Sequence, residues 1–230
     1  MRHDPPALML FAAGFGTRMG ALTAHRPKPL IPVAGRPLID HALALANDVH
    51  ADPIIANVHY LPEMLEAYLD KSAVQTIREE PDILDTGGGL RNALPLLGRD
   101  TVVTLNSDAV WSGPNPVAML QDAWEPERMD ALLICVPMAQ VHGRLSGGDF
   151  DIDQKGHLHR GGSTVYGGVQ VLKTELLHEV AETAFSLNVV WNMMADNNRL
   201  FGLRYPGHWC DVGHPGGIAE AEQMLADTRV

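Results

Sequence analysis

The chain has 230 residues, of which 46% are hydrophobic, so it is long enough to bury a substantial core. Its 17 lysines and arginines stand against 28 aspartates and glutamates, and the formal charge of −11 excludes a general attraction to nucleic acid or to anionic membranes. No stretch approaches the roughly 20 apolar residues that cross a bilayer. Cys135 and Cys210 are too few for a disulfide framework or a cysteine-based zinc site, and the cytoplasm is the expected compartment.

The first predicted elements are a strand and a glycine loop. Residues 7–11 form a short apolar run typical of a buried strand, and residues 12–19 follow it with Gly14 and Gly16. Because glycine has no Cβ, the backbone N–H groups of such a loop can come close to an anion. The pattern therefore predicts a strand that leads directly into an anion-binding loop.

Two positive charges accompany the glycines. Arg18 lies in the same loop, and Lys28 stands between Pro27 and Pro29. Full charges of this kind suit a polyphosphate. A dinucleotide-binding fingerprint fits poorly, because its third glycine would fall at Met19 and it requires no cation afterwards. The sequence thus favours a polyphosphate site over that of a dehydrogenase.

The rest of the chain alternates between helical and strand patterns. Within residues 37–50, Leu38, Ala42, Leu45 and Val49 recur at helical spacing. Further helices are expected at 62–69, 89–97, 116–124, 184–195 and 215–228, and strands at 53–58, 74–78, 101–105, 131–136, 164–172 and 200–205. A stretch rich in glycine and charge predicts a β-hairpin within 147–162. This order predicts an α/β fold: a Rossmann-like three-layer α/β/α arrangement with a mostly parallel central sheet and a small β-hairpin excursion.

The strand at 101–105 delivers polar residues to one edge of the predicted sheet. Asn106, Ser107 and Asp108 follow it directly. Open α/β sheets bind their ligands beyond the carboxyl ends of the strands. We therefore expect a ligand beside Asp108. An asparagine after a strand is also a common turn former, so both roles stay open for Asn106.

Several motifs resemble landmarks of the sugar-1-phosphate nucleotidyltransferases. The loop at 14–18 and the proline-flanked Lys28 are similar to the Gly-x-Gly-x-Arg and Pro-Lys-Pro hallmarks of this family. Further similar segments follow in the family's order: residues 85–90, 105–108, 148–150, 166–169 and 209–213. The resemblance spans most of the chain and implies that residues 1–230 form a single nucleotidyltransferase domain. It also implies an enzyme that combines a nucleoside triphosphate with a sugar 1-phosphate, releases pyrophosphate and uses Mg²⁺.

Two segments are most similar to one branch of the family. Residues 86–89, a threonine with three glycines, and residues 148–150, Gly-Asp-Phe, resemble the branch that transfers a uridylyl group from UTP to N-acetylmuramate α-1-phosphate, giving UDP-N-acetylmuramate in peptidoglycan recycling. Glucose 1-phosphate with UTP or dTTP, and mannose 1-phosphate with GTP, remain alternative pairs. A non-catalytic nucleotide-sensing subunit is the third alternative. It is disfavoured because such a protein would be expected to have lost a loop cation or a metal carboxylate.

The resemblance assigns roles to individual residues. Arg18 and Lys28 are the expected catalytic residues, since their charges neutralise the leaving pyrophosphate. Asp108 and Asp211 are expected to hold Mg²⁺, a hard cation that prefers oxygen ligands. Nucleotide binding is expected from Ala13, Gly14, Gly16, Thr17, Arg18, Lys28, Gly87 and Asn106. The expected partners are a nucleoside triphosphate and a sugar 1-phosphate, without nucleic acid or membrane, and the oligomeric state stays open.

The sugar is expected to bind beside the predicted hairpin. By the same resemblance, Asp149 accepts hydrogen bonds from hydroxyl or amide groups of the sugar, and Gly168 allows its close approach. The carboxylate of N-acetylmuramate needs a cation or a donor. Arg144, Lys155 and Arg160 are candidates that the sequence does not rank.

The glycines at 87–89 have two readings. They could let a flat base lie against the backbone, where main-chain hydrogen bonds read uracil, or they could open the helix at 89–97 with free amides. Residues 78–80, just upstream, are expected to be a solvated charged face. Ser107 stands where the family usually has glycine.

Overall fold

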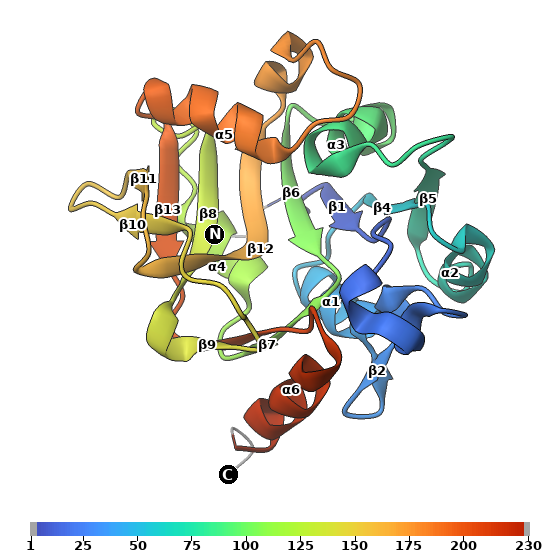
Figure 1. The fold of residues 1–230 in the computed structure, drawn as a ribbon. Coiled ribbons are helices and arrows are strands. Elements are labelled where there is room, and N and C mark those ends of the chain that lie inside the picture. The colour runs from blue at the N-terminus through green and yellow to red at the C-terminus, as the bar shows by residue number, and fades with distance from the viewer. Residues whose placement is uncertain (1–3, 228–230) are drawn as a thin grey trace.

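The computed structural model describes residues 4–227, so the outermost residues of the predicted 1–230 domain, and the predicted helix end at Thr228, lie outside the described residues. One mixed sheet runs through the molecule in the order β5-β4-β1-β6-β12-β8-β13 (Figure 1). Its strands are β1 (Leu8–Phe11), β4 (Ile54–Val58), β5 (Val74–Arg78), β6 (Thr101–Asn106), β8 (Ala131–Pro137), β12 (Thr164–Lys173) and β13 (Leu200–Arg204). Neighbouring strands are parallel except where β12 lies antiparallel to β6 and β8.

Helices cover both faces of this sheet. The helices α1 (Leu38–Asp48), α2 (Pro62–Leu69) and α4 (Pro116–Ala123) contribute to the core on one face, and α3 (Asp85–Leu97) and α5 (Leu187–Asp196) pack together on the other (Figure 1). Alternation along β1 sends Leu8 and Leu10 into the first core and Met9 into the second. The predicted three-layer fold with a mostly parallel sheet is therefore confirmed.

The predicted hairpin is present, with β10 (Phe150–Ile152) antiparallel to β11 (Leu158–Arg160), and β10 also pairs with β12. A second small sheet, in the order β7-β14-β9, was not predicted. Its strands β7 (Ala109–Ser112), β9 (Val141–His142) and β14 (His208–Asp211) are too short to leave a clear alternating pattern in the sequence. The last helix, α6 (Pro215–Asp227), packs on this sheet. The remaining short elements are β2 (Pro32–Val33), β3 (Arg36–Pro37) and the 3₁₀ helices η1 (Thr17–Thr23), η2 (Lys28–Leu30), η3 (Met138–Gln140) and η4 (Glu175–Glu179).

The glycines at 87–89 lie inside α3, which begins at Asp85, so the prediction that this helix starts at residue 89 was wrong. Each glycine is needed because another segment presses against the helix. A Cβ on Gly87 would overlap the ring of Phe185, and one on Gly88 would overlap the carbonyl oxygen of Thr183. A Cβ on Gly89 would overlap the carboxylate of Glu79. The three glycines therefore let α3 approach two neighbouring segments closely.

We expect Gly89→Ala to lower the free energy of unfolding by about 1 to 3 kcal/mol, because the added methyl group forces the buried Glu79 carboxylate to move. Chemical denaturation measures the change. Gly162→Ala is the matched control: no atom lies within 4 Å of the Cβ it would add, so its unfolding midpoint should match or exceed that of the wild type. Equal midpoints for the two variants would contradict the packing argument.

Candidate active site

The carboxyl ends of three neighbouring strands meet at one edge of the sheet. Phe11, the last residue of β1, is in register with Asn57 of β4 on one side and Asn106 of β6 on the other. Because β4 and β6 flank β1 and the chain order reverses there, this is a topological switch point, where open α/β sheets bind ligands. The glycine loop leaves β1 at this point. Ser107 faces the protein, since its Oγ donates a 2.6 Å hydrogen bond to the Phe11 carbonyl oxygen.

Two pockets open at this edge. The first, which we call the loop pocket, has a volume of about 270 Å³. It is lined by Phe11, Ala12, Ala13, Gly14, Lys28, Pro29, Asn57, Glu79, Ile83, Asp85, Thr86, Asn106, Ser107 and Asp108. The predicted nucleotide-binding residues Ala13, Gly14, Lys28 and Asn106 thus share one cavity.

A buried polar chain forms one wall of the loop pocket. The Ala12 N–H donates to Asn57 Oδ1 at 2.8 Å, and Asn57 Nδ2 donates to Glu79 Oε1 at 2.7 Å. The other oxygen of Glu79 accepts from the Leu84 N–H at 2.7 Å. Glu79 is only 1% exposed, so the expectation of a solvated face at 78–80 was wrong for this residue. Burial of the carboxylate is tolerated because donors satisfy both of its oxygens.

The second cavity, the hairpin pocket, has a volume of about 350 Å³. It shares Phe11, Asp85, Thr86, Asn106 and Asp108 with the loop pocket. The rest of its lining comes from Arg18, Arg144, Asp149, Phe150, Arg160, Tyr166, Ser186, Leu187, Asn188, Trp191, Trp209 and Asp211. Molecules bound in the two pockets would therefore face each other across Asp108.

A lysine and a carboxylate meet at the junction of the pockets. Lys28 Nζ lies 2.7 Å from Asp108 Oδ2, and the lysine side chain is only 10% exposed. The Pro27–Lys28–Pro29 segment holds this lysine in η2, with Lys28 and Pro29 both buried. Lys28 therefore points into the site instead of into bulk water.

Asp211 reaches the same junction from the far end of the chain. In β14 it pairs with Ala109, the residue after Asp108, and the Val212 N–H donates to the Asp108 carbonyl oxygen at 3.0 Å. Cys210 and Val212 are buried against α6, so the alternation of the strand turns Asp211 to the opposite side. The Asp211 carboxylate borders Gly213, as does the Arg18 guanidinium. The small unpredicted sheet thus brings together residues that are about half the chain apart.

The environment of Asp211 is costly for a negative charge. Burial raises the pKa of this carboxyl, and the nearby charge of Asp108 raises it further, while Lys28, Arg18 and Arg144 act in the opposite direction. Two carboxylates close together and partly withdrawn from water are a suitable ligand set for a hard divalent cation, which takes one or two carboxylates and completes its shell with phosphate oxygens and water. Within residues 4–227 there is no group of three or more histidine, cysteine or carboxylate side chains that could hold a metal.

The glycines of the loop play different parts. Gly16 has a φ of +65°, and a Cβ there would lie 3.0 Å from Lys28 Cβ, so the turn needs glycine in order to pack on the lysine. Gly14 lines the loop pocket, is not among the residues with a positive φ, and leaves room for a Cβ, which would meet no atom within 4 Å. That space is open to a ligand. Thr17 begins η1 and lines neither pocket.

The structure places Gly87 and Gly168 behind the pockets, not in their walls. The Gly87 N–H donates to the Phe185 carbonyl oxygen at 2.8 Å, so this amide is already used within the protein. Gly168 has a φ of +84°, and a Cβ there would lie 2.8 Å from Asn106 Cγ. Gly168 therefore allows β12 to pack closely against the Asn106 side chain.

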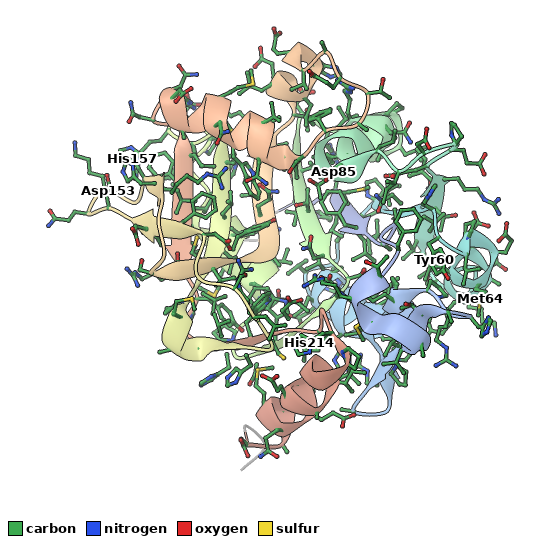
Figure 2. All side chains as sticks on the ribbon, in the orientation of Figure 1. Tyr60, Met64, Asp85, Asp153, His157 and His214 are labelled. Atoms are coloured by element: carbon green, nitrogen blue, oxygen red, sulfur yellow. The ribbon has the colours of Figure 1, made fainter. Side chains whose placement is uncertain are left out.

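Asp85 and Thr86 line both pockets, and the sequence analysis assigned them no role. Figure 2 shows Asp85 near the centre of the molecule, where α3 faces α5. Asp85 has a φ of +59°, which an L-residue rarely adopts, and Thr86 Oγ1 accepts a 3.0 Å hydrogen bond from the Leu187 N–H. In the sequence, both residues belong to the segment 85–90 that resembles a family landmark, but that resemblance indicated no contact for either of them.

Asp149, for which we predicted a contact with the sugar, lines the hairpin pocket, and both of its carboxylate oxygens have partners within the protein. Its Oδ1 lies 2.6 Å from Arg144 Nη2, and its Oδ2 accepts from the Tyr166 N–H at 3.0 Å. Trp209 lines the same pocket and donates from Nε1 to the Gly167 carbonyl oxygen. This end of the pocket is held by fixed polar contacts.

In metal-free protein at pH 8, we expect Asp211→Asn to raise the melting temperature. Because the folded-state pKa of Asp211 is raised, the protonated carboxyl contributes stability that is lost as the pH rises through that pKa, and the variant avoids this loss. Thermal unfolding in the presence of a chelator measures the difference, which should shrink as the pH is lowered. Asp149→Asn, which breaks a paired carboxylate, should instead lower the melting temperature. A lower melting temperature for both variants would contradict the argument.

Comparisons with known proteins identify the family of the chain. A family model described as the MobA-like NTP transferase domain matches residues 8–215. A Caulobacter vibrioides protein named N-acetylmuramate alpha-1-phosphate uridylyltransferase is 34% identical over 241 residues, which cover 99% of this chain and 100% of that protein. A Neisseria meningitidis serogroup B protein of the same name is 29% identical over 226 residues, which cover 94% of this chain and 96% of that protein.

Among solved structures, a UDP-glucose pyrophosphorylase from Acinetobacter baumanii has a TM-score of 0.80 at 18% identity, over 95% of this chain and 92% of that one, which shows a shared fold. No helix within residues 4–227 has the length and apolar character needed to cross a membrane. The predicted resemblance and the prediction of an enzyme are confirmed. The chain belongs to the family of MobA-like NTP transferase domains, and its relatives within it are sugar-1-phosphate nucleotidyltransferases.

Proposed function

We propose that this enzyme transfers a uridylyl group from UTP to N-acetylmuramate α-1-phosphate, giving UDP-N-acetylmuramate and pyrophosphate, and that it serves peptidoglycan recycling in the cytoplasm. The observation that carries the proposal is the pair of adjoining pockets that share Asp108, with Lys28 at the junction and Arg18 and Asp211 beside it. The full-length relative at 34% identity supports the choice of substrates.

The loop pocket takes UTP in this proposal. The backbone of Ala13 and Gly14 and the charge of Lys28 bind the triphosphate in this pocket, and the open space at Gly14 leaves room for its oxygens. Arg18 adds its charge from the adjoining hairpin pocket. An oxygen of the sugar phosphate attacks the α-phosphorus, and the bond to pyrophosphate breaks. The attacking oxygen is already ionised at neutral pH, so the protein needs no general base. Its task is to align two anions and to stabilise the charge that develops on the leaving group.

Asp108 and Asp211 are the residues that would hold Mg²⁺. The fit rests on the donor set: two carboxylates, brought together by the pairing of β14 with β7, line one pocket, and oxygen ligands of this kind suit a hard dication. A bound dication would also offset the repulsion that helps to raise the pKa of Asp211. When bound, Mg²⁺ neutralises phosphate charge at the junction. Lys28 orients one of these carboxylates, because its 2.7 Å contact holds Asp108 in place before any substrate binds.

The hairpin pocket takes the sugar 1-phosphate. Its phosphate lies toward Asp108 and Asp211, and the ring lies toward Asp149 and Trp209. Asp149 accepts a hydrogen bond from the sugar through a carboxylate that is held in place at Oδ1 by Arg144 and at Oδ2 by the Tyr166 amide. Gly168 contributes indirectly, by positioning Asn106 in the wall between the two substrates.

Pyrophosphate release tests the substrate assignment. The purified protein is given UTP, dTTP or GTP in combination with the 1-phosphates of N-acetylmuramate, glucose or mannose. We expect the highest kcat/KM for UTP with N-acetylmuramate α-1-phosphate. A clear preference for another pair would replace these substrates. Nucleotide binding without pyrophosphate release from any pair would favour a non-catalytic sensor.

We expect Asp108→Asn and Asp211→Asn each to lower kcat by about 100-fold or more, because each removes charge stabilisation at the reacting phosphates. The matched control is Asp153→Asn. Figure 2 shows Asp153 at the outer tip of the hairpin, and it lines neither pocket. Steady-state kinetics at limiting Mg²⁺, with circular dichroism to check folding, measures the effect. Near-normal turnover in both variants would contradict the metal assignment.

A further inference from the structure

Arg160 is a positioned cation without a counter-charge in the wall of the hairpin pocket. Its Nη2 donates to Asn188 Oδ1 at 2.8 Å and to Asn192 Oδ1 at 3.0 Å. Its guanidinium lies over the Phe150 ring, with Cζ 4.7 Å from the ring centroid. These partners are neutral, and no carboxylate among the described residues forms an ion pair with Arg160.

The contacts of Arg160 orient it without neutralising it. Asn188 and Asn192 are one helical turn apart on α5, and Asn188 Nδ2 donates to Ser186 Oγ at 3.0 Å, which directs its oxygen to the arginine. An exposed arginine usually samples many rotamers, whereas this one is held by two amides and a ring. The N–H groups on Nε and Nη1 donate to no described residue, so they are free for an anion.

Arg144 and Lys155, the other two cations that the sequence offers for the carboxylate, are less suitable than Arg160. Arg144 Nη2 lies 2.6 Å from Asp149 Oδ1. Its charge is therefore already neutralised by a carboxylate of the protein. Lys155 lies in the turn of the hairpin and lines neither pocket.

The backbone amides at the N-terminus of α5 are also not available to bind an anion. The Leu187 N–H donates to Thr86 Oγ1 and the Asn188 N–H donates to Ser186 Oγ, so these first-turn amides already have acceptors. A second anionic group on a molecule in this pocket would therefore meet its unpaired donors at Arg160.

We propose that Arg160 binds a carboxylate on the acceptor and thereby selects an acidic sugar 1-phosphate over a neutral one. This inference rests on the proposed function, in which the hairpin pocket holds N-acetylmuramate α-1-phosphate. The lactyl ether on O3 of that sugar carries the carboxylate, a second anionic group separate from the phosphate on C1. Asp108 and Asp211 mark the phosphate end of the pocket, and Arg160 lies in the hairpin and α5 wall.

The experiment compares two acceptors that differ only in the lactyl group: N-acetylmuramate α-1-phosphate and N-acetylglucosamine α-1-phosphate, each with UTP. For Arg160→Ala we expect kcat/KM to fall about tenfold to a hundredfold with the first acceptor and to change less than about threefold with the second. Arg160→Gln, which keeps a polar side chain without the charge, should show the same selective loss. It provides a second measurement should the alanine variant fold poorly.

Arg128→Ala is the matched control. Arg128 also lies over an aromatic ring, with Cζ 4.7 Å from the Phe201 centroid, but outside both pockets. It should leave both kcat/KM values unchanged. If the Arg160 variants lose the same factor in kcat/KM with both acceptors, Arg160 has a structural role and the inference is overturned. The inference is also overturned if the variants keep the wild-type ratio of the two kcat/KM values. If the wild type itself uses neither acceptor, the proposed function fails and this inference fails with it.

Discussion

The ion pair between Lys28 and Asp108 is the interaction on which the rest of the site depends. Two opposite charges 2.7 Å apart, with the lysine largely withdrawn from water, gain little stability, because desolvation offsets their attraction. The ion pair instead fixes the positions of the two side chains. Lys28 comes from the glycine-loop side and Asp108 from the end of β6, so the pair joins two substrate pockets at one point. Asp211 and Arg18 lie close enough to act on this pair or on each other.

Much of the structure around this pair keeps the walls of the pockets rigid. The chain of hydrogen bonds from Ala12 through Asn57 to Glu79 connects the glycine loop to β4 and to the segment before α3. The glycines of α3 let that helix press against Glu79 and Phe185, so the buried carboxylate cannot shift without moving the helix. A site that works by electrostatic stabilisation needs such fixed dipoles and charges, because reorganisation during the reaction would cost part of the gain.

The cations at the two ends of the hairpin pocket differ in whether a carboxylate neutralises them. At the phosphate end, the charges of Lys28 and Arg18 act against those of Asp108 and Asp211, and beside the sugar ring Arg144 is neutralised by Asp149. At the opposite end, Arg160 keeps its charge and is held only by amide oxygens and an aromatic ring. The sequence did not rank Arg144, Lys155 and Arg160, since all three are single cations near one hairpin. The structure distinguishes them: Arg144 pairs with Asp149, Lys155 lies outside both pockets, and Arg160 is held by two asparagines of α5.

The sequence by itself determined the alternation of strands and helices and therefore the three-layer fold, because apolar periodicity is a local property. It also indicated the glycine loop and Asp108, which follow strand ends where local pattern and ligand position coincide, and Lys28, which two prolines mark. Only the tertiary structure decided that Glu79 is buried and that Asp85 and Thr86 line both pockets. It also decided that the Gly87 N–H donates to the Phe185 carbonyl oxygen. These facts depend on which distant segments pack together. The meeting of Asp211 with Asp108 has the same cause: strands of two to four residues leave no signal in the sequence, and pairing across a hundred residues brings the carboxylates to one place.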